Sequence, residues 1–311
     1  MKSKLRLSVL ISCYNYGHYL QEAVKSVLDQ ERPVDEIIVI DDGSTDDTPS
    51  HVGALEALDS RVVIDRTENR GQLGAMLRGI ALATGDIVFF LDADDLYKPT
   101  HTKAFMDIFE SQHHVDFVYG DYEEFGDRQN VYRGFLSGCD HDHGRTALVC
   151  KYSLRNYGSI SSVTAARREL LLPLLRFPDH WITDWPTAGD LAMNLYASLA
   201  GGRKMYYFGD TVYYRVHGEN DHLKQAQLAD STWQMRRFRA NRWVARVASE
   251  MCPGDALLQY IDREVKTVPR LSGTEYLHIF KLLIRCPLPC TVRLILIAKV
   301  TAQRLAAIIS R

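Results

Sequence analysis

Four apolar segments in the first hundred residues alternate with stretches of helical periodicity, and this order limits the folds open to the chain. The strand-like segments are residues 7–13, 36–41, 61–65 and 86–92. Apolar residues recur at helical spacing in 19–30 and 72–83. Strands that alternate with helices form parallel sheets. The sequence therefore predicts an α/β fold, a mostly parallel sheet flanked by helices.

Three of these strand-like segments end in polar residues that suit ligand binding. The residues at the three ends are Ser12, Tyr14, Asn15, Asp41, Asp42, Asp92, Asp94 and Asp95. In open α/β sheets, ligands bind beyond the carboxyl ends of the strands. We therefore expect these side chains to lie along one edge of the sheet.

The acidic segment 92–95 has two interpretations. Its carboxylates cannot lie unpaired in a core, because desolvating a charge without compensation is costly. Hard oxygen ligands at a strand end suit Mg²⁺ or Mn²⁺, which in turn bind phosphate oxygens. The alternative is an Asp-rich turn that caps the next helix. In the segment 41–48 both interpretations are compatible, since one carboxylate can cap while another binds a base or ribose.

Beyond residue 116 the pattern changes. We expect a strand at 117–122, a loop at 126–145, a helix at 190–200, and short aromatic strands at 204–208 and 211–216. From about residue 225 the chain becomes helical and basic. The sequence thus predicts a main domain at 1–224 and a helical C-terminal extension at 225–311.

Four motifs occur together in the order of a known family. They are SCYNYGHYL at 12–20, SVLDQ at 26–30, DDGSTD at 41–46 and ATGDIVFFLDADD at 83–95. Together they resemble the family 2 inverting glycosyltransferases, closely over about the first 100 residues and more loosely to about residue 220. The resemblance implies the nucleotide-diphospho-sugar transferase fold of the glycosyltransferase A type, with 1–224 as the catalytic domain.

The resemblance also implies a donor site at the strand ends. Tyr14 would lie near the nucleotide base, and Asp42 would hydrogen-bond the base, which is uracil if the donor is a UDP-sugar. Ser12 would belong to the same site and Asp92 would contact the ribose. Asp94 would bind a divalent metal, Mn²⁺ or Mg²⁺, that holds the diphosphate. Neutralising the charge of the leaving nucleoside diphosphate would supply much of the rate.

The resemblance places the catalytic base farther along the chain. An inverting transfer needs a carboxylate that takes the proton of the acceptor hydroxyl while its oxygen attacks the anomeric carbon. The family has an Asp at the start of a helix and a Gly about three turns later, which Asp190 and Gly201 match. Gly189 departs from the family, where an acid is frequent. Asp184 is the alternative base, and a helix N-cap is the alternative role of Asp190.

Two other segments contain histidines. The segment 213–217 is similar to the family, which implies that His217 binds the metal or the diphosphate and that Arg215 reaches a phosphate. An ordinary surface or core position is the alternative for His217. The segment with Cys139, His141 and His143 lacks a known metal-ligand spacing. We therefore expect that second segment to be a loop facing the acceptor, with metal binding as the alternative.

The C-terminal third combines basic and apolar residues. Residues 276–311 contain no acid, and basic residues punctuate apolar runs such as 294–298. This pattern is typical of a helix at a membrane surface, and it would suit a lipid-linked acceptor as well as a saccharide. The alternatives are packing on the catalytic domain and a homodimer interface.

The composition indicates which class of partner and which cellular location to expect. A formal net charge of -2 does not favour a nucleic-acid partner. Six scattered cysteines are typical of reduced thiols and not of a disulfide framework. We see no secretory signal after the first residues and no apolar stretch of about 18 residues. We therefore expect a cytoplasmic protein, or one at the inner face of the membrane.

Two other functions compete with sugar transfer. A non-catalytic nucleotide-sugar-binding or scaffold protein could keep the donor site, although the proposed metal ligands and base argue against it. A sugar-1-phosphate nucleotidyltransferase would need a glycine- and lysine-rich phosphate loop after the first strand, and residues 12–17 are not such a loop.

Overall fold

The computed structural model describes residues 4–55, 57–135, 138–220, 231–253, 255–286 and 288–309. Its strands are β1 (Leu7–Cys13), β2 (Glu36–Asp41), β3 (Val62–Arg66), β4 (Ile87–Asp92), β5 (Leu96–Tyr97), β6 (Phe117–Gly126), β7 (Asn130–Tyr132), β8 (His141–Arg145), β9 (Thr164–Arg167) and β10 (Arg203–Val216). Its α-helices are α1 (Gly17–Leu28), α2 (Thr48–Val52), α3 (Gly71–Leu82), α4 (His101–Ser111), α5 (Ala147–Ser153), α6 (Arg168–Leu171), α7 (Asp179–Ile182), α8 (Gly189–Leu199), α10 (Ser231–Met251), α11 (Ile261–Val265), α12 (Gly273–Arg285) and α13 (Cys290–Ile309). Three 3₁₀ helices within these ranges are η1 (Ser161–Val163), η2 (Leu172–Arg176) and η3 (Asp255–Tyr260).

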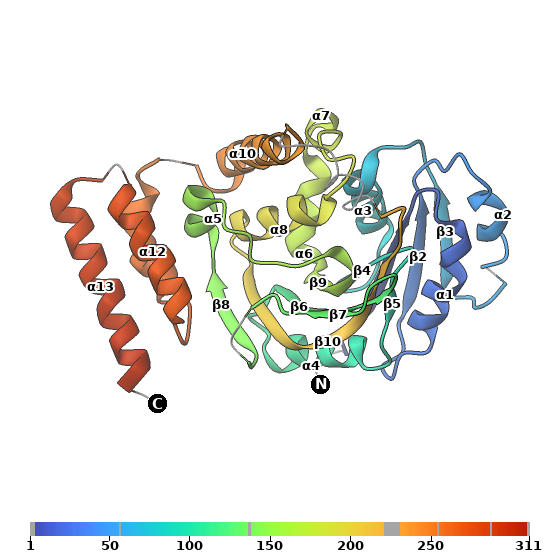
Figure 1. Ribbon diagram of the computed structural model, residues 1–311, viewed down its shortest axis with the longest axis horizontal. Coiled ribbons are helices and arrows are strands. Elements are labelled where there is room, and N and C mark those ends of the chain that lie inside the picture. The colour runs from blue at the N-terminus through green and yellow to red at the C-terminus, as the bar shows by residue number, and fades with distance from the viewer. Residues whose placement is uncertain are drawn as a thin grey trace.

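The first four long strands form the parallel part of one sheet, in the order β3–β2–β1–β4 (Figure 1). This confirms the parallel arrangement predicted for the first hundred residues. Along β1, Val9 and Ile11 pack with α1 and α4, while Leu10 packs with α3 and α8 on the opposite face. Helices cover both faces, so these strands are apolar at nearly every position.

Beyond β4 the sheet is mixed. Strand β9 lies antiparallel between β4 and β6, and β10 then runs parallel to β6. Short β5 pairs antiparallel with β10. The α/β class with flanking helices is therefore confirmed, with a parallel half of the sheet joined to a mixed half.

The prediction of a loop at 126–145 is wrong in two places. Residues 130–132 form β7 against β6, and residues 141–145 form β8 against β10. Histidine, aspartate and glycine give β8 the composition of a loop. Its alternation is nevertheless that of a strand, because His141 and His143 are buried while Asp142 between them is less so.

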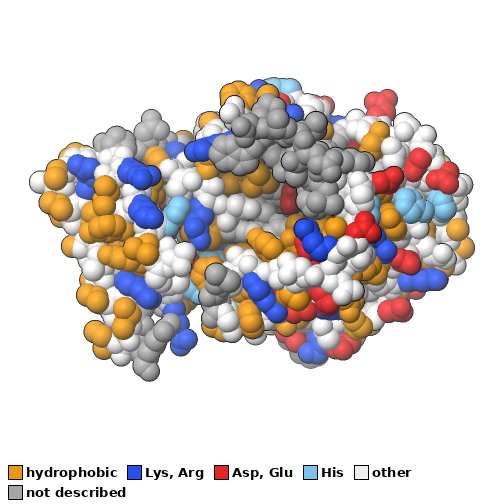
Figure 2. Space-filling view, in the orientation of Figure 1, with side chains coloured by type: hydrophobic (Ala, Val, Ile, Leu, Met, Phe, Trp, Pro, Cys, Tyr) orange, Lys and Arg blue, Asp and Glu red, His pale blue; other side chains and the backbone are white. Residues whose placement is uncertain are grey.

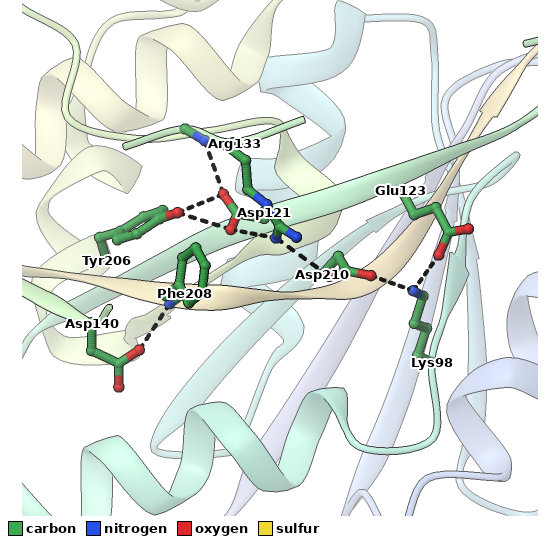
Figure 3. Close-up of polar contacts among 9 residues, drawn as sticks. Lys98, Asp121, Glu123, Arg133, Asp140, Tyr206, Phe208 and Asp210 are labelled. Atoms are coloured by element: carbon green, nitrogen blue, oxygen red, sulfur yellow. Dashed lines mark hydrogen bonds and ion pairs between the residues drawn. The ribbon is translucent and has the colours of Figure 1, made fainter. Parts of the chain in front are cut away.

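A single strand, β10, replaces the two short strands predicted at 204–208 and 211–216. Register shifts on either side of Asp210 interrupt its pairing with β6, which explains the two separate aromatic runs in the sequence. The carboxylate of Asp210 lies 2.8 Å from Lys98 Nζ and 3.3 Å from an Arg133 nitrogen (Figure 3). These ion pairs hold the irregular part of β10 in place.

The same polar network extends to β6. Lys98 also contacts Glu123 at 2.5 Å, and Arg133 contacts buried Asp121 at 2.9 Å (Figure 3). Asp121 in turn accepts a hydrogen bond of 2.7 Å from the Tyr206 hydroxyl. The network therefore links β6 and β10 to the residues that follow β5 and β7.

The C-terminal helices divide between two hydrophobic clusters. Trp243 and Val247 of α10 pack into the main core beside α8, and the Trp243 indole donates to the Ala192 carbonyl at 3.0 Å. Helices α11, α12 and α13 form a separate cluster with α5. They lie at the end of the molecule farthest from β3 and α2 (Figure 1). The helical C-terminal region is as predicted, while the domain boundary expected between 224 and 225 lies outside the described residues.

Among the described residues, no helix combines the length and the apolar character needed to span a bilayer.

Candidate active site

The polar ends of the strands meet at one edge of the sheet, as predicted. Cys13 at the end of β1 is in register with Asp41 of β2, and Ser12 is in register with Asp92 of β4. Asn15 has a positive φ of 60° and joins the first two loops. Its backbone N–H donates to Ser44 Oγ at 2.9 Å. The turn after β1 is therefore fixed against the turn after β2.

A cavity of about 1040 Å³ opens at this edge. Six of the predicted site residues line it: Ser12, Tyr14, Asp42, Asp92, Asp94 and Asp190. Residues from segments nearly 180 positions apart therefore share one cavity. Arg215, His217 and Asp184 are not among the described residues of its wall.

Asp41 and Asp42 have different environments. The Asp41 carboxylate accepts a 2.9 Å hydrogen bond from the Ser44 N–H and so closes the turn. Asp42 lines the cavity and accepts a 2.9 Å bond from the Arg70 N–H. Burial raises the pKa of Asp42 despite these hydrogen bonds. Asp41 therefore forms the turn, whereas its neighbour Asp42 lines the cavity.

Asp92 is held by three side chains. Ser161 donates to it at 2.5 Å, and Ser12 and Gln72 each donate at 3.2 Å. Burial, followed by the nearby charge of Asp94, raises the pKa of Asp92 to about 7. The hydrogen bonds fix the orientation of the carboxylate at the cavity wall.

Asp94 lies beside a histidine from the far end of β10. His217 Nε2 is 3.0 Å from an Asp94 carboxylate oxygen, and the Asn220 amide donates to the same oxygen at 3.3 Å. Arg215 lies behind Asp94: its Nε donates to the Asp94 carbonyl at 2.8 Å, and another of its nitrogens pairs with Glu22 at 2.6 Å. In this position Arg215 supports the Asp94 backbone and lies outside the cavity wall.

Asp95 has a structural environment. It is fully buried, accepts a 2.5 Å hydrogen bond from Ser162 and accepts the Arg215 N–H at 2.9 Å. Burial and the charges of Asp94 and Asp92 raise its pKa well above the usual range. Asp95 therefore ties the end of β4 to η1 and β10.

Asp190 faces the same cavity from the first turn of α8. The N-cap of this helix is Ala188, with φ +60°, so the alternative interpretation of Asp190 as the N-cap is wrong. Asp190 accepts the Leu191 N–H at 2.7 Å. Gly189 has a steric reason to lack a side chain, because a Cβ there would lie 2.8 Å from the Leu73 backbone nitrogen.

Gln72 connects the two halves of the site, and the sequence did not identify it. Its amide nitrogen donates to Asp92 at 3.2 Å, and its carbonyl oxygen accepts the Gly189 N–H at 2.8 Å. One side chain thus sets the donor-side carboxylate and the start of α8 relative to each other. The sequence feature that could have identified Gln72 is its polar side chain at the start of the apolar helix predicted at 72–83.

Asp184, the alternative base, has other partners. It pairs with Arg246 at 2.7 Å and with Arg242, both on α10. These two arginines, through their hydrogen bonds and charges, hold the pKa of Asp184 below its usual value, although burial opposes them. Asp184 therefore joins the segment before α8 to α10, away from the cavity.

The charge of the cavity fits a bound cation. Its acidic residues are Asp42, Asp46, Asp92, Asp94, Glu124, Asp190 and Glu219, and no Lys or Arg is among its described wall residues. A diphosphate would be repelled here without positive charge. The Asp94 carboxylate and the His217 imidazole, 3.0 Å apart, offer oxygen and nitrogen ligands to a divalent metal. The residues present thus fit the expected ion.

The second histidine segment is a largely buried strand and not the loop that was expected. His141 and His143 are buried, and both contact Glu275 of α12. Aromatic rings in tilted and T-shaped arrangements, including Phe135 and Tyr157, pack against them. These histidines therefore belong to the joint between β8 and the C-terminal helices.

A sheet with helices on both faces and an acidic cavity at the ends of its parallel strands agrees with the glycosyltransferase A fold that the sequence motifs imply. Comparisons with known proteins identify the family. The family model described as glycosyl transferase family 2 matches residues 8–164. An uncharacterized glycosyltransferase of Nostoc sp. is 30% identical over 229 residues, 71% of this chain and 68% of the relative. The chain belongs to glycosyltransferase family 2.

Two further similarities cover different shares of the chain. TuaG of Bacillus subtilis, a glycosyltransferase named for teichuronic acid biosynthesis, is 40% identical over 93 residues, 30% of this chain and 37% of TuaG. The crystal structure of S. aureus TarS 1-349 in complex with UDP-GlcNAc has a TM-score of 0.60 at 19% identity, covering 97% of this chain and 89% of that one. The second similarity concerns the fold alone.

Proposed function

We propose that this glycosyltransferase moves a sugar from a nucleotide-diphosphate sugar to an acceptor hydroxyl with inversion at the anomeric carbon. One observation carries the proposal: Asp42, Asp92 and Asp94 at the strand ends share a cavity with Asp190 of α8. Three carboxylates on one side suit donor binding, and one on the other suits proton transfer. The donor is proposed to be a UDP-sugar, which the UDP-GlcNAc complex of the structurally similar TarS supports.

On the donor side, each residue has a distinct task. Tyr14, 43% exposed at the cavity, is free to cover the nucleotide base. Asp42 hydrogen-bonds the base, and Asp92, oriented by Ser12, contacts the ribose. Asp94 and His217 would hold Mn²⁺ or Mg²⁺, which when bound supplies the positive charge that a diphosphate leaving group requires. We propose that Arg215 acts by supporting Asp94.

On the acceptor side, Asp190 is the proposed base. Its carboxylate takes the proton of the acceptor hydroxyl while the oxygen attacks the anomeric carbon and the nucleoside diphosphate leaves. Attack from the face opposite the leaving group inverts the configuration. Gln72 keeps the start of α8 at a fixed position relative to Asp92, so that donor and base remain aligned.

The proposed acceptor belongs to polysaccharide, glycolipid or glycoconjugate assembly. The name of TuaG supports this assignment. A surface feature supports a lipid-linked acceptor: α12 and α13 expose apolar residues such as Leu277, Leu294 and Ile295. Figure 2 shows apolar and basic side chains, with little acidic surface, over this end of the molecule. Such a surface suits the headgroups of an anionic membrane at the cytoplasmic face.

Nucleotide release tests the donor assignment. The purified chain is incubated with a panel of nucleotide sugars, with Mn²⁺ or with EDTA, and the released nucleoside diphosphate is measured. We expect release from a UDP-sugar that depends on the metal, and NMR of the freshly released sugar should show inverted configuration. Binding of a UDP-sugar without release from any donor would instead support the non-catalytic scaffold alternative.

Vesicle flotation tests the membrane proposal. The full-length protein should float with anionic vesicles and less with neutral ones. The double variant Leu294→Ser, Ile295→Ser should lose flotation, whereas Val131→Ser, an exposed apolar residue on β7, should not. If the wild-type protein stays in the soluble fraction with anionic vesicles, the membrane proposal fails. Sedimentation equilibrium would then test whether the same face forms a dimer.

A further inference from the structure

A second cluster of metal-ligating side chains lies outside the proposed active site. His141 and His143 of β8 and Glu275 of α12 place one ligand atom each within 4.8 Å of one another. His141 Nε2 lies 3.0 Å from one carboxylate oxygen of Glu275, and His143 Nδ1 lies 2.7 Å from the other. All three residues are buried. This set contains two imidazoles and one carboxylate, which are common ligands of zinc.

Local structure explains why the ligands converge. His141 and His143 are two positions apart on a strand, so both side chains point to the same side of β8. Glu275 is at the third position of α12, and its position is set by a capping box with Ser272. The Ser272 N–H donates to Glu275 at 2.9 Å, and the Glu275 N–H donates to Ser272 Oγ at 3.1 Å. The third ligand is therefore fixed by its own helix before any ion binds.

The surroundings match the outer shell of a metal site. Metal-binding histidines usually donate their second ring N–H to a neighbouring group, which fixes the orientation of the ring. His143 Nε2 lies 2.7 Å from the Tyr119 hydroxyl, so its far nitrogen has such a partner. Phe135 packs 4.6 Å from the His141 ring and 4.9 Å from the His143 ring. An apolar wall of this kind limits water and strengthens the metal–ligand interaction.

The ligand atoms lie slightly closer together than they would around a bound zinc ion. Ligands at about 2.0–2.1 Å from zinc in a tetrahedron lie about 3.3 Å apart. The contacts of 2.7 and 3.0 Å in the cluster are the hydrogen bonds of its metal-free form. On binding, each neutral histidine keeps one proton, which moves to its far nitrogen. For His143 that nitrogen faces the Tyr119 oxygen.

We propose that His141, His143 and Glu275 bind one zinc-type divalent ion that fastens α12 to β8. The ion would connect the C-terminal helical cluster to the catalytic sheet through residues more than 130 positions apart. A water molecule would complete the coordination. The site is independent of the proposed donor metal at Asp94, and it has a structural role.

Metal content tests this site without reference to activity. The full-length Asp94→Asn variant removes the proposed donor site, and it is loaded with Zn²⁺, dialysed and measured by mass spectrometry. We expect one zinc per chain in this variant, and none when His143→Gln is added. In the variant with His143→Gln, zinc affinity should fall by more than the roughly 10–100-fold that is typical of losing an outer-shell partner. The control is His278→Gln, since His278 lies on α12 but contacts Ser153.

Cobalt substitution keeps the proposal testable if His143→Gln does not fold. Co²⁺ at the cluster should give the visible bands of a tetrahedral site in the Asp94→Asn background, and His143→Cys should add a thiolate-to-cobalt band. Chelation should lower the midpoint of thermal unfolding of the zinc-loaded protein. If Asp94→Asn retains no zinc and shows no tetrahedral cobalt spectrum, or if His143→Gln retains as much zinc, the cluster is an ion pair and not a metal site.

Discussion

Two clusters in this protein pair carboxylates with histidine, and they differ in their charge balance. At the active site, Asp94 contacts one histidine, His217, while Asp92 and Asp95 add two more carboxylates nearby. At the joint with the C-terminal helices, Glu275 contacts two histidines and is their only described carboxylate partner. The first cluster opens onto a cavity, whereas the second is surrounded by aromatic rings.

This difference separates a binding site from a structural joint. Burial, and after it the charges of neighbouring carboxylates, raises the pKa of Asp92 and Asp95, so a bound cation would relieve an unfavourable concentration of charge at the first cluster. At the second, burial acts to raise the pKa of Glu275, but hydrogen bonds from His141 and His143 hold it well below the usual range. Substitutions at the first cluster should therefore change activity, and substitutions at the second should change stability.

The largest effect is expected at the carboxylate that faces the first cluster across the cavity. Asp190→Asn should lower kcat by about 10²–10⁴-fold, the usual contribution of a general base. Nucleotide affinity should change little, because Asp190 belongs to α8 and not to the strand ends that are proposed to hold the nucleotide. Sugar transfer, or donor hydrolysis if no acceptor is found, measures the change. Asp184→Asn is the matched control, and a larger loss there would make Asp184 the base.

The next effect concerns the metal. Asp94→Asn keeps the shape of the side chain and removes its charge. We expect metal-dependent turnover to fall by about 10²-fold or more, since an interaction with the developing charge is lost. The free energy of unfolding should change by less than about 1 kcal/mol, because a repulsive charge is removed as well. Turnover against Mn²⁺ concentration measures the effect; an unchanged metal dependence would contradict the assignment.

The opposite result is expected at the second cluster. Glu275→Gln should lower the free energy of unfolding by about 3 kcal/mol, because two buried imidazoles lose their charged partner. The kcat measured at a temperature where the variant is folded should stay within about twofold of wild type. Denaturant unfolding and initial rates on the same preparation make the comparison. A large loss of kcat in the folded variant would connect this joint to catalysis.

A buried histidine without an acid partner gives a smaller, pH-dependent effect. His101 contacts Thr211 at 2.7 Å, and burial lowers its pKa from 6.5 to about 3. Between these values the unfolded chain binds a proton that the folded chain does not, so stability falls as the pH falls. From pH 6.5 to 4.5 this group should cost about 2 kcal/mol. Denaturant unfolding at the two pH values should show that His101→Asn loses less free energy of unfolding than wild type as the pH falls. An equal loss in the two proteins would contradict the assignment.

The smallest effect is expected at the helix cap beside Glu275. Ser272→Ala removes one half of the capping box of α12 and should lower the free energy of unfolding by about 1 kcal/mol. Ser249→Ala on α10, whose described hydrogen bond lies within its own helix, serves as the control. If Ser272→Ala costs as much as Glu275→Gln, the capping box and not the histidine contacts would dominate the joint.

Much of the donor side could be predicted from the sequence. Buried parallel strands are continuous apolar runs, and their carboxyl ends share an edge, so Ser12, Asp42 and Asp92 could be placed together from local patterns alone. The helix predicted at 190–200 was also visible, as helical spacing followed by a glycine, and α8 begins one residue earlier at Gly189. These features depend on residues close to one another in the chain.

Contacts between distant residues were decided only by the tertiary structure. No local pattern indicates that Gln72 bridges Asp92 and Gly189, or that Asp184 pairs with α10. Nor could the loop-like composition of β8 reveal that His143 meets Glu275, 132 positions later. Periodicity and turn chemistry specify local conformation, but the partner of a buried polar side chain depends on which elements the packed core brings together.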